Sequence, residues 1–420
     1  MFKTLRDSWK VLDIRKKILY TLLMLFVYRL GVYVSIPGIS LDVVEQQISN
    51  STLLTFLSLL SGGGLDNMSI FAQGITPYIN ASIIMNLLTV AIPALERLQK
   101  EGQEGQKKIS NITRYVAVGI GLVQATAILI SFINAGAIDP TVFNIIMVLL
   151  CLTAGTALVM WIGERITEKG IGNGISLLIF VSIISRLPSA IYDSIAQVAA
   201  GTQTIIETLM ILALALLVVT GITFVDMGER RIPVQYAKRV VGRKMYGGQS
   251  THIPMRVNQS GVIPIIFAIT LINFPIIITE MVAKDSSLYQ FLSNNFSSNG
   301  ASPVYLITYA LLILFFTYFY SQITFNPVDV AKNMQQYAGF IPGIRSGKPT
   351  SDYLHKILSR ITLFGALFLA LVAVIPTMIN ATLFSIFGAT SLMIMVSVSL
   401  ETTKQLESQM MMRHYKGFLK

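Results

Sequence analysis

The chain has 420 residues, of which 53% are hydrophobic and 13% are charged, and its mean hydropathy is +0.65. This composition excludes an ordinary soluble domain and predicts an all-α polytopic membrane protein. A single cysteine, Cys151, excludes an intrachain disulfide and a thiolate metal site, and the three histidines lie apart without ligand spacing. We therefore expect neither a metal nor a cofactor.

Ten apolar runs are about 20 residues long, the length that crosses roughly 30 Å of hydrocarbon. They lie at 18–36, 75–94, 114–134, 142–162, 172–191, 205–225, 259–279, 303–323, 361–380 and 387–405. The first run follows a basic segment, as in a signal peptide. It is too long for one and lacks a small-residue cleavage site, so we expect an uncleaved first helix.

A short apolar segment, residues 53–60, lies between the first two runs and is followed by "SGGGLDNMS" at 61–69. The segment is too short to cross a bilayer, and no regular helix favours three consecutive glycines. Taken alone, this pattern favours a re-entrant or surface loop.

The basic residues set the orientation. All but three of the 32 lysines and arginines precede the first run, follow the second, fourth, sixth or eighth run, or lie in the C-terminal tail. The exceptions are Arg186 and Lys284 in the opposite connections and Arg29 inside the first run. The positive-inside rule therefore places both termini in the cytoplasm. The net charge of +11 is a property of the cytoplasmic surface.

Two cytoplasmic connections, 227–258 and 326–360, are much longer than a turn between helices requires. Basic segments of this length are suited to contact an anionic partner, such as ribosomal RNA or acidic patches of a motor protein. The alternative is that their charge only sets topology and contacts lipid headgroups.

Several kinds of chemistry are missing from the sequence. "GIRSGKPT" at 343–350 has three residues between its glycines and a proline after the lysine, so it is not a nucleotide-binding loop. None of the ten runs has Asp or Glu in its middle, which disfavours an ion-coupled carrier. No arrangement of side chains suggests catalysis, so we expect a protein that is not an enzyme.

Five long motifs decide the family. They are "SIFAQGITPYINASIIMNLLTV" (69–90), "EGQKKISNITRY" (104–115), "GERITEKGIGNGISLLIF" (163–180), "YAKRVVGRKMYGGQSTHIPMRVNQSGVIPIIFA" (236–268) and "FGATSLMIMV" (387–396). Together they closely resemble the SecY family, the channel subunits of the bacterial Sec translocase, and the similarity extends over essentially the whole chain. The resemblance implies ten helices in two inverted, pseudo-symmetric halves of five, residues 1–200 and 201–420.

The resemblance also implies a plug, a short helix at about 53–68 that folds into the outer funnel of the channel. Leu57 and Leu60 would belong to its apolar body, and Gly62, Gly63 and Gly64 would form a hinge.

A ring of aliphatic side chains at mid-membrane is a further implication. By motif matching it comprises Ile79, Ile83, Ile179, Ile183, Ile263, Ile266 and Ile394. Spacings of three or four residues place each pair on one helical face. Such a ring resists ion leak because aliphatic walls do not replace the hydration shell of an ion. Without the family, each isoleucine is ordinary packing or a lipid contact.

Polar candidates fall into two further groups. Asn86, Gln124 and Asn273 are candidates for the seam of a lateral gate that opens toward lipid; the alternative is simple helix–helix hydrogen bonding. The candidate contacts for the ribosome or SecA are Lys238, Arg239, Arg243, Lys244 and Arg345. Many relatives have Arg-Pro-Gly where this chain has Arg345-Ser346-Gly347, and loss of the proline relaxes the local turn.

The family implies a multi-pass channel of the bacterial plasma membrane. Such a channel passes unfolded secretory polypeptides across the membrane and releases transmembrane segments sideways into lipid. The implied partners are SecE-like and SecG-like small subunits, the SecA ATPase, the ribosome, signal sequences with their unfolded chains, and lipids. Two alternatives stay open: an accessory paralogue for a few substrates, and a secondary solute transporter.

Overall fold

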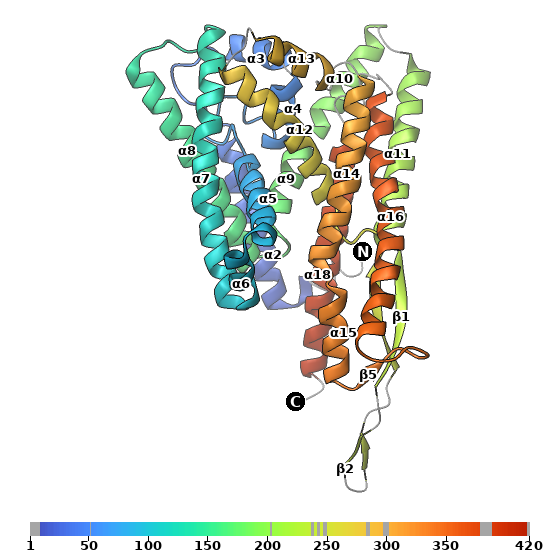
Figure 1. Ribbon diagram of the computed structural model, residues 1–420. Coiled ribbons are helices and arrows are strands. Elements are labelled where there is room, and N and C mark those ends of the chain that lie inside the picture. Colours follow the sequence, from blue (N-terminus) through green and yellow to red (C-terminus); the bar gives the residue numbers. More distant parts are fainter. Residues whose placement is uncertain are drawn as a thin grey trace. The chain divides into compact units, whose positions relative to one another are not determined.

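The computed structural model describes residues 9–50, 52–201, 204–236, 239–241, 244–246, 250–282, 286–296, 302–378 and 389–417. It is mostly helical (Figure 1). The chain forms two compact units. Unit 1 comprises Met1–Thr208, Thr270–Ser302 and Val398–Lys420, and unit 2 comprises Leu209–Ile269 and Pro303–Ser397.

Unit 1 contains most of the N-terminal helices. They are α2 (Leu12–Gly31), α3 (Leu41–Asn50), α4 (Thr52–Ser61), α5 (Thr76–Ala91), α6 (Pro93–Lys100), α7 (Gln103–Asn134), α8 (Val142–Lys169), α9 (Gly174–Ile184), α10 (Leu187–Ala199) and α13 (Ser287–Phe296). Three helices contribute residues to both units: α11 (Ile205–Met227), α12 (Ile263–Val282) and α18 (Ala389–Gly417).

The helices of unit 1 pack in sequence order, α5 along α7, α7 along α8 and α8 along α9. Gly155 of α8 lets this helix approach the segment before α5, because a Cβ at this position would lie 1.7 Å from the carbonyl oxygen of Ile70. A buried Gln73 links two of the helices, because its Nε2 donates to the Gly121 carbonyl at 3.1 Å and its Oε1 accepts from Thr156 Oγ1 at 2.7 Å. Both ends of the Gln73 amide are thus satisfied inside an apolar bundle.

Unit 2 combines long helices with a small antiparallel sheet. Its further helices are α14 (Pro303–Thr324), α15 (Pro327–Gln336) and α16 (Lys348–Met378). Its strands are β1 (Glu229–Tyr236), β2 (Arg239–Val241), β3 (Lys244–Tyr246), β4 (Ser250–Arg256) and β5 (Gly339–Phe340). The strand order is β4-β1-β5, with β2 and β3 paired separately. Figure 1 shows β1 beside the lower part of α16.

The two long connections therefore contain regular structure, which their sequence, notable mainly for its basic residues, did not predict. In β1, Ile232 and Val234 are buried and their neighbours point outward, the period of two expected of a strand with one covered face. They share a core with Met255 of β4 and with Leu354 and Leu358 of α16. Each strand contributes only two residues to this core, Ile232 and Val234 in β1 and Ile253 and Met255 in β4, and a proline separates the two. A search for long apolar runs therefore does not detect these strands.

Six helical segments in the described part of the chain are long and apolar enough to cross a membrane. They are α7, α8, Gly174–Ala199, α11, Pro303–Gln336 and Lys348–Ile375. The pair α5–α6, bent by 99°, would make seven if it counts as one span. Helix α2 is not among the six segments, because the uncharged stretch between Lys17 and Arg29 is too short to cross a membrane. The ten predicted spans thus stay a prediction.

Candidate functional site

The glycine-rich stretch after α4 forms a compact site in unit 1. Helix α4 ends at Ser61, and the chain then turns through Gly62 and Gly63, whose φ angles are +66° and +90°. The amide of Gly63 donates to the carbonyl of Ser58 at 3.0 Å, which closes the end of the helix. Glycine is favoured because other L residues rarely adopt these angles.

The glycines also bring the chain into tight contact with its neighbours. A Cβ at Gly62 would lie 2.8 Å from Cα of Ser182 on α9, and one at Gly64 would lie 2.9 Å from the carbonyl oxygen of Phe71. Beside any role as a hinge, Gly62 therefore lets the turn lie directly against the α9 backbone, and Gly64 lets it lie against the backbone of Phe71.

The apolar side of α4 is buried. Leu54 and Leu60 are 5% and 4% exposed, and Leu57 packs against the core that contains Leu65 and Met68. Helix α4 is also tied to α3, because Thr55 Oγ1 donates to the carbonyl of Ile48 at 2.9 Å. We call residues 52–69, which comprise α4 and the turn after it and include the plug predicted at about 53–68, the plug segment. Its role as a plug stays a prediction.

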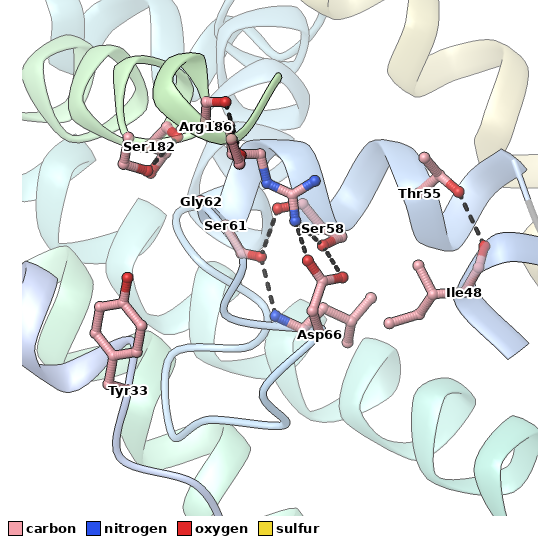
Figure 2. A network of polar contacts seen from close by, with 12 residues as sticks. Tyr33, Ile48, Thr55, Ser58, Ser61, Gly62, Asp66, Ser182 and Arg186 are labelled. Atoms are coloured by element: carbon pink, nitrogen blue, oxygen red, sulfur yellow. Dashed lines mark hydrogen bonds and ion pairs between the residues drawn. The ribbon is translucent and has the colours of Figure 1, made fainter. Parts of the chain in front are cut away.

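A polar network holds the plug segment from the α9 side (Figure 2). Arg186, two residues after the end of α9, donates through Nη2 to Ser58 Oγ and forms an ion pair with Asp66. Ser58 in turn donates to Asp66. The side chains of Arg186 and Asp66 are 28% and 39% exposed, so the ion pair is partly shielded from solvent.

Helix α2 contributes a second set of contacts. Arg29 Nη1 donates to the carbonyl of Gly62 at 2.6 Å, and its Nη2 donates to the hydroxyl of Tyr33 at 2.8 Å. The buried hydroxyl of Tyr28 shares a hydrogen bond of 2.8 Å with Ser182 and lies 3.3 Å from the carbonyl of Ser61. Side chains from α2 and from the end of α9 therefore meet at one turn.

The candidate ring residues are divided between the units. Ile79 and Ile83 of α5 and Ile179 and Ile183 of α9 belong to unit 1 and are all buried. The three others belong to unit 2: Ile263 and Ile266 begin α12 and are half-buried, and Ile394 of α18 is buried. The seven-residue ring stays a prediction.

The polar gate candidates are all half-buried within helices. Asn86 lies on α5 and Gln124 on α7, two helices that pack along each other, and Asn273 lies on α12. Their role as a gate seam stays a prediction.

The candidate cytoplasmic contacts are only partly visible. Lys238 and Arg243 lie outside the described residues, whereas Arg239 and Lys244 lie on β2 and β3. Arg345 is exposed, and its carbonyl accepts a hydrogen bond of 2.8 Å from Thr350 Oγ1. This hydrogen bond fixes the turn at a place where many relatives have a proline and this chain has Ser346.

Sequence reasoning missed Arg29, Arg186, Asp66 and Tyr28 as site residues. The available signal was the charge distribution, because Arg29 and Arg186 are two of the three basic residues outside the predicted cytoplasmic segments. Among the described residues, no group of three or more His, Cys, Asp or Glu side chains is placed to hold a metal ion.

Comparison with known proteins identifies the family. The family model described as SecY matches residues 69–403. The chain is 45% identical over 441 residues to the protein translocase subunit SecY of Streptomyces galbus, and all of both chains is covered. Its identity to the protein of the same name in Mycobacterium tuberculosis H37Rv is 44% over 446 residues, again with full coverage. The chain belongs to the SecY family.

The fold agrees with solved SecY-type structures. A structure described as a protein conducting channel matches with a TM-score of 0.66 at 19% identity and covers 95% of this chain and 93% of its own. Sec61 of a canine ribosome–channel complex matches with a TM-score of 0.62 at 18% identity, with the same coverage. The family predicted from the five motifs is thus confirmed, as is the likeness of the helical fold to SecY.

Proposed function

We propose that this chain is the protein-conducting channel of a bacterial Sec translocase. The main support for the proposal is that this chain is 44–45% identical, over its full length, to proteins named protein translocase subunit SecY. Unfolded secretory polypeptides cross the plasma membrane through it, and transmembrane segments leave it sideways into lipid. It is not an enzyme; SecA or the ribosome supplies the driving energy.

The proposed architecture has ten spanning helices in two inverted halves, 1–200 and 201–420, with both termini in the cytoplasm. The charge distribution supports this orientation, since all but three lysines and arginines fall on one side. The seven isoleucines form the mid-membrane ring, which resists the passage of ions but widens for a polypeptide. The plug segment seals the ring at rest, and the half-buried Asn86, Gln124 and Asn273 line the lateral gate.

The proposed partners include a SecE-like and a SecG-like subunit, SecA, and the ribosome. Two similar structures come from ribosome-bound complexes, canine Sec61 and the idle yeast Ssh1 complex on the 80S ribosome. On this chain the basic β2–β3 hairpin and the exposed Arg345 would meet these partners. Electrostatic attraction of such segments to RNA phosphates weakens with salt, which gives the contact a testable signature.

A photo-crosslinker at Ile83 tests the function and the ring together. The protein is reconstituted with its small subunits and presented with a secretory chain arrested during transport. We expect a crosslink from Ile83 that disappears when the signal sequence is deleted. The matched control places the same probe at Leu122 of α7, an exposed apolar position. We expect no crosslink to the secretory chain from this position.

Two negative results have different meanings. If the chain binds the cytoplasmic segments but crosslinks at neither Ile83 nor Ile183, the assignment of the ring is wrong. If no chain binds while SecA and ribosomes are both supplied, the translocase function is wrong and solute transport is the next function to test.

A further inference from the structure

Arg29 and Arg186 both contact the turn after α4, although the positive-inside rule does not explain the position of either residue. Arg29 lies inside the first predicted span, and Arg186 lies in a connection on the side that is otherwise almost free of basic residues. Within a membrane a charged side chain is unfavourable unless it has a partner. Both arginines have one: Arg29 binds the carbonyl of Gly62, and Arg186 binds Ser58 and Asp66.

We propose that Arg29 and Arg186 form a two-arginine clasp that holds the plug segment against α9, and that release of Arg186 from Asp66 is a distinct step in opening the channel. The inference rests on the proposed channel function. It makes these residues positioning residues for the plug segment.

The arrangement of the contacts favours this role. Ser58 lies in the last turn of α4 and Asp66 lies beyond the glycines, so that Arg186 joins the two ends of the turn (Figure 2). The apolar contacts of α4 are non-directional and allow it to slide, whereas hydrogen bonds to charged groups fix a position. The clasp therefore adds directional contacts to the apolar burial that already holds the segment.

Partial exposure makes the clasp reversible. A fully buried ion pair would leave an uncompensated buried charge when it opens, which is strongly unfavourable. At 28% and 39% exposure, Arg186 and Asp66 each have access to water when they separate. Opening therefore needs a moderate force, of the kind that an advancing polypeptide supplies.

The clasp also connects the plug segment to the candidate ring. Arg186 is three residues after Ile183, and Gly62 lies against Ser182, the residue before it. A polypeptide that displaces α9 at Ile183 thus acts directly on the element to which the turn is fastened.

Ion leak through the resting channel tests the inference. The protein is reconstituted with its small subunits in vesicles without substrate, and chloride efflux is measured for Arg186→Gln, Asp66→Asn and the double variant. We expect each single variant to raise the leak about tenfold, equivalent to about 1.4 kcal/mol. The double variant should leak no more than Arg186→Gln alone, because the change at Asp66 has no ion pair left to break once the arginine is removed.

The pair Arg114–Glu164 provides the matched control. It joins α7 to α8 with an Nε–Oε1 distance of 2.6 Å and is likewise partly exposed, but it does not touch the plug segment. Arg114→Gln should leave the leak unchanged. Arg186→Lys, which keeps the charge, should leak less than Arg186→Gln.

Each outcome decides between alternatives. An unchanged leak in Asp66→Asn, additive leaks in the double variant, or an equal leak in Arg114→Gln would overturn the clasp. If Arg186→Gln fails to fold, the near-isosteric Asp66→Asn carries the test with the same expected tenfold increase. Signal-dependent transport by the unaltered protein is measured in parallel, so that failure of the clasp is distinguished from failure of the channel function.

Discussion

The guanidinium of Arg29 donates a hydrogen bond of 2.6 Å to the backbone carbonyl of Gly62. The acceptor is main chain, so this contact depends on the path of the turn and not on any side chain of the plug segment. Arg29 also stacks over the ring of Tyr33, with 4.9 Å from Cζ to the ring centroid, which limits its rotamers. A preset side chain loses less entropy when it binds.

Replacing Arg29 by methionine should loosen the turn. A hydrogen bond to a charged group contributes about 1.5–3 kcal/mol when shielded, and we expect the lower end because Arg29 is only partly buried. The leak of substrate-free vesicles should therefore rise by about tenfold. Tyr33→Phe is the control: it removes the 2.8 Å bond from Arg29 but leaves the bond to Gly62, and its leak should stay near that of the unaltered protein. Equal leaks in the two variants would contradict this role of Arg29.

Gly62→Ala should destabilise unit 1 through two effects. The residue has a φ of +66°, and its Cβ would lie 2.8 Å from Cα of Ser182. Left-handed backbone strain costs about 1–2 kcal/mol, and overpacking adds about 1–3 kcal/mol. We expect a clear fall in the thermal unfolding midpoint of the detergent-solubilised protein.

Two other glycines separate these effects. Gly136 has a φ of +76° but open space around it, so Gly136→Ala should show the backbone strain alone. Gly119 lies in α7 with nothing within 4 Å of its Cβ position, and Gly119→Ala should raise stability by about 0.5–1 kcal/mol. A midpoint for Gly62→Ala equal to that for Gly136→Ala would contradict the close contact with Ser182.

Several elements could be predicted from the sequence alone because they are long uninterrupted apolar runs. The predicted segments 205–225 and 303–323 correspond to α11, which begins at Ile205, and to α14, which begins at Pro303. The predicted segment 172–191 is interrupted, with α9 ending at Ile184 and α10 starting at Leu187. Pro188 in the first turn of α10 was the available signal, since proline favours a helix start.

The network around the plug segment could not be predicted in the same way. Asp66 and Arg186 are 120 residues apart, and no local pattern links two positions so distant in one sequence. What the sequence did contain was a basic residue on the unfavoured side of the predicted topology. Such an exception indicates that a partner exists without identifying it, and only the fold brings Asp66 to Arg186.

Ile232→Ala should loosen the sheet of unit 2. Ile232 is 2% exposed in the core between β1 and α16, and truncation of a buried isoleucine costs about 2–5 kcal/mol. Trypsin should therefore cleave the neighbouring Arg230 and Arg231 faster. Gln235→Ala, on the exposed face of the same strand, should leave the cleavage rate unchanged. Similar rates for both variants would contradict the register in which Ile232 faces the core.

Asp226→Ala should weaken the base of the same sheet. Asp226, at the end of α11, accepts a hydrogen bond of 2.8 Å from Asn258 Nδ2 and another from Ser397 Oγ. Asn258 is 7% exposed, so removal of the carboxylate leaves a buried donor unpaired, at a cost of about 1–3 kcal/mol. Amide hydrogen exchange in β1 and β4 should accelerate by about tenfold.

Arg231→Gln is the matched control for this exchange experiment. It removes an ion pair of 2.7 Å with Glu229 in the same strand, but the Arg231 side chain is 66% exposed. An exposed pair contributes about 0.2–1 kcal/mol, so exchange in β1 should change by less than about fivefold. If Asp226→Ala accelerates exchange no more than Arg231→Gln does, Asp226 does not anchor the sheet. If Asp226→Ala accelerates exchange more than Arg231→Gln does, and only in β1 and β4, the carboxylate of Asp226 is needed to order the sheet that follows α11.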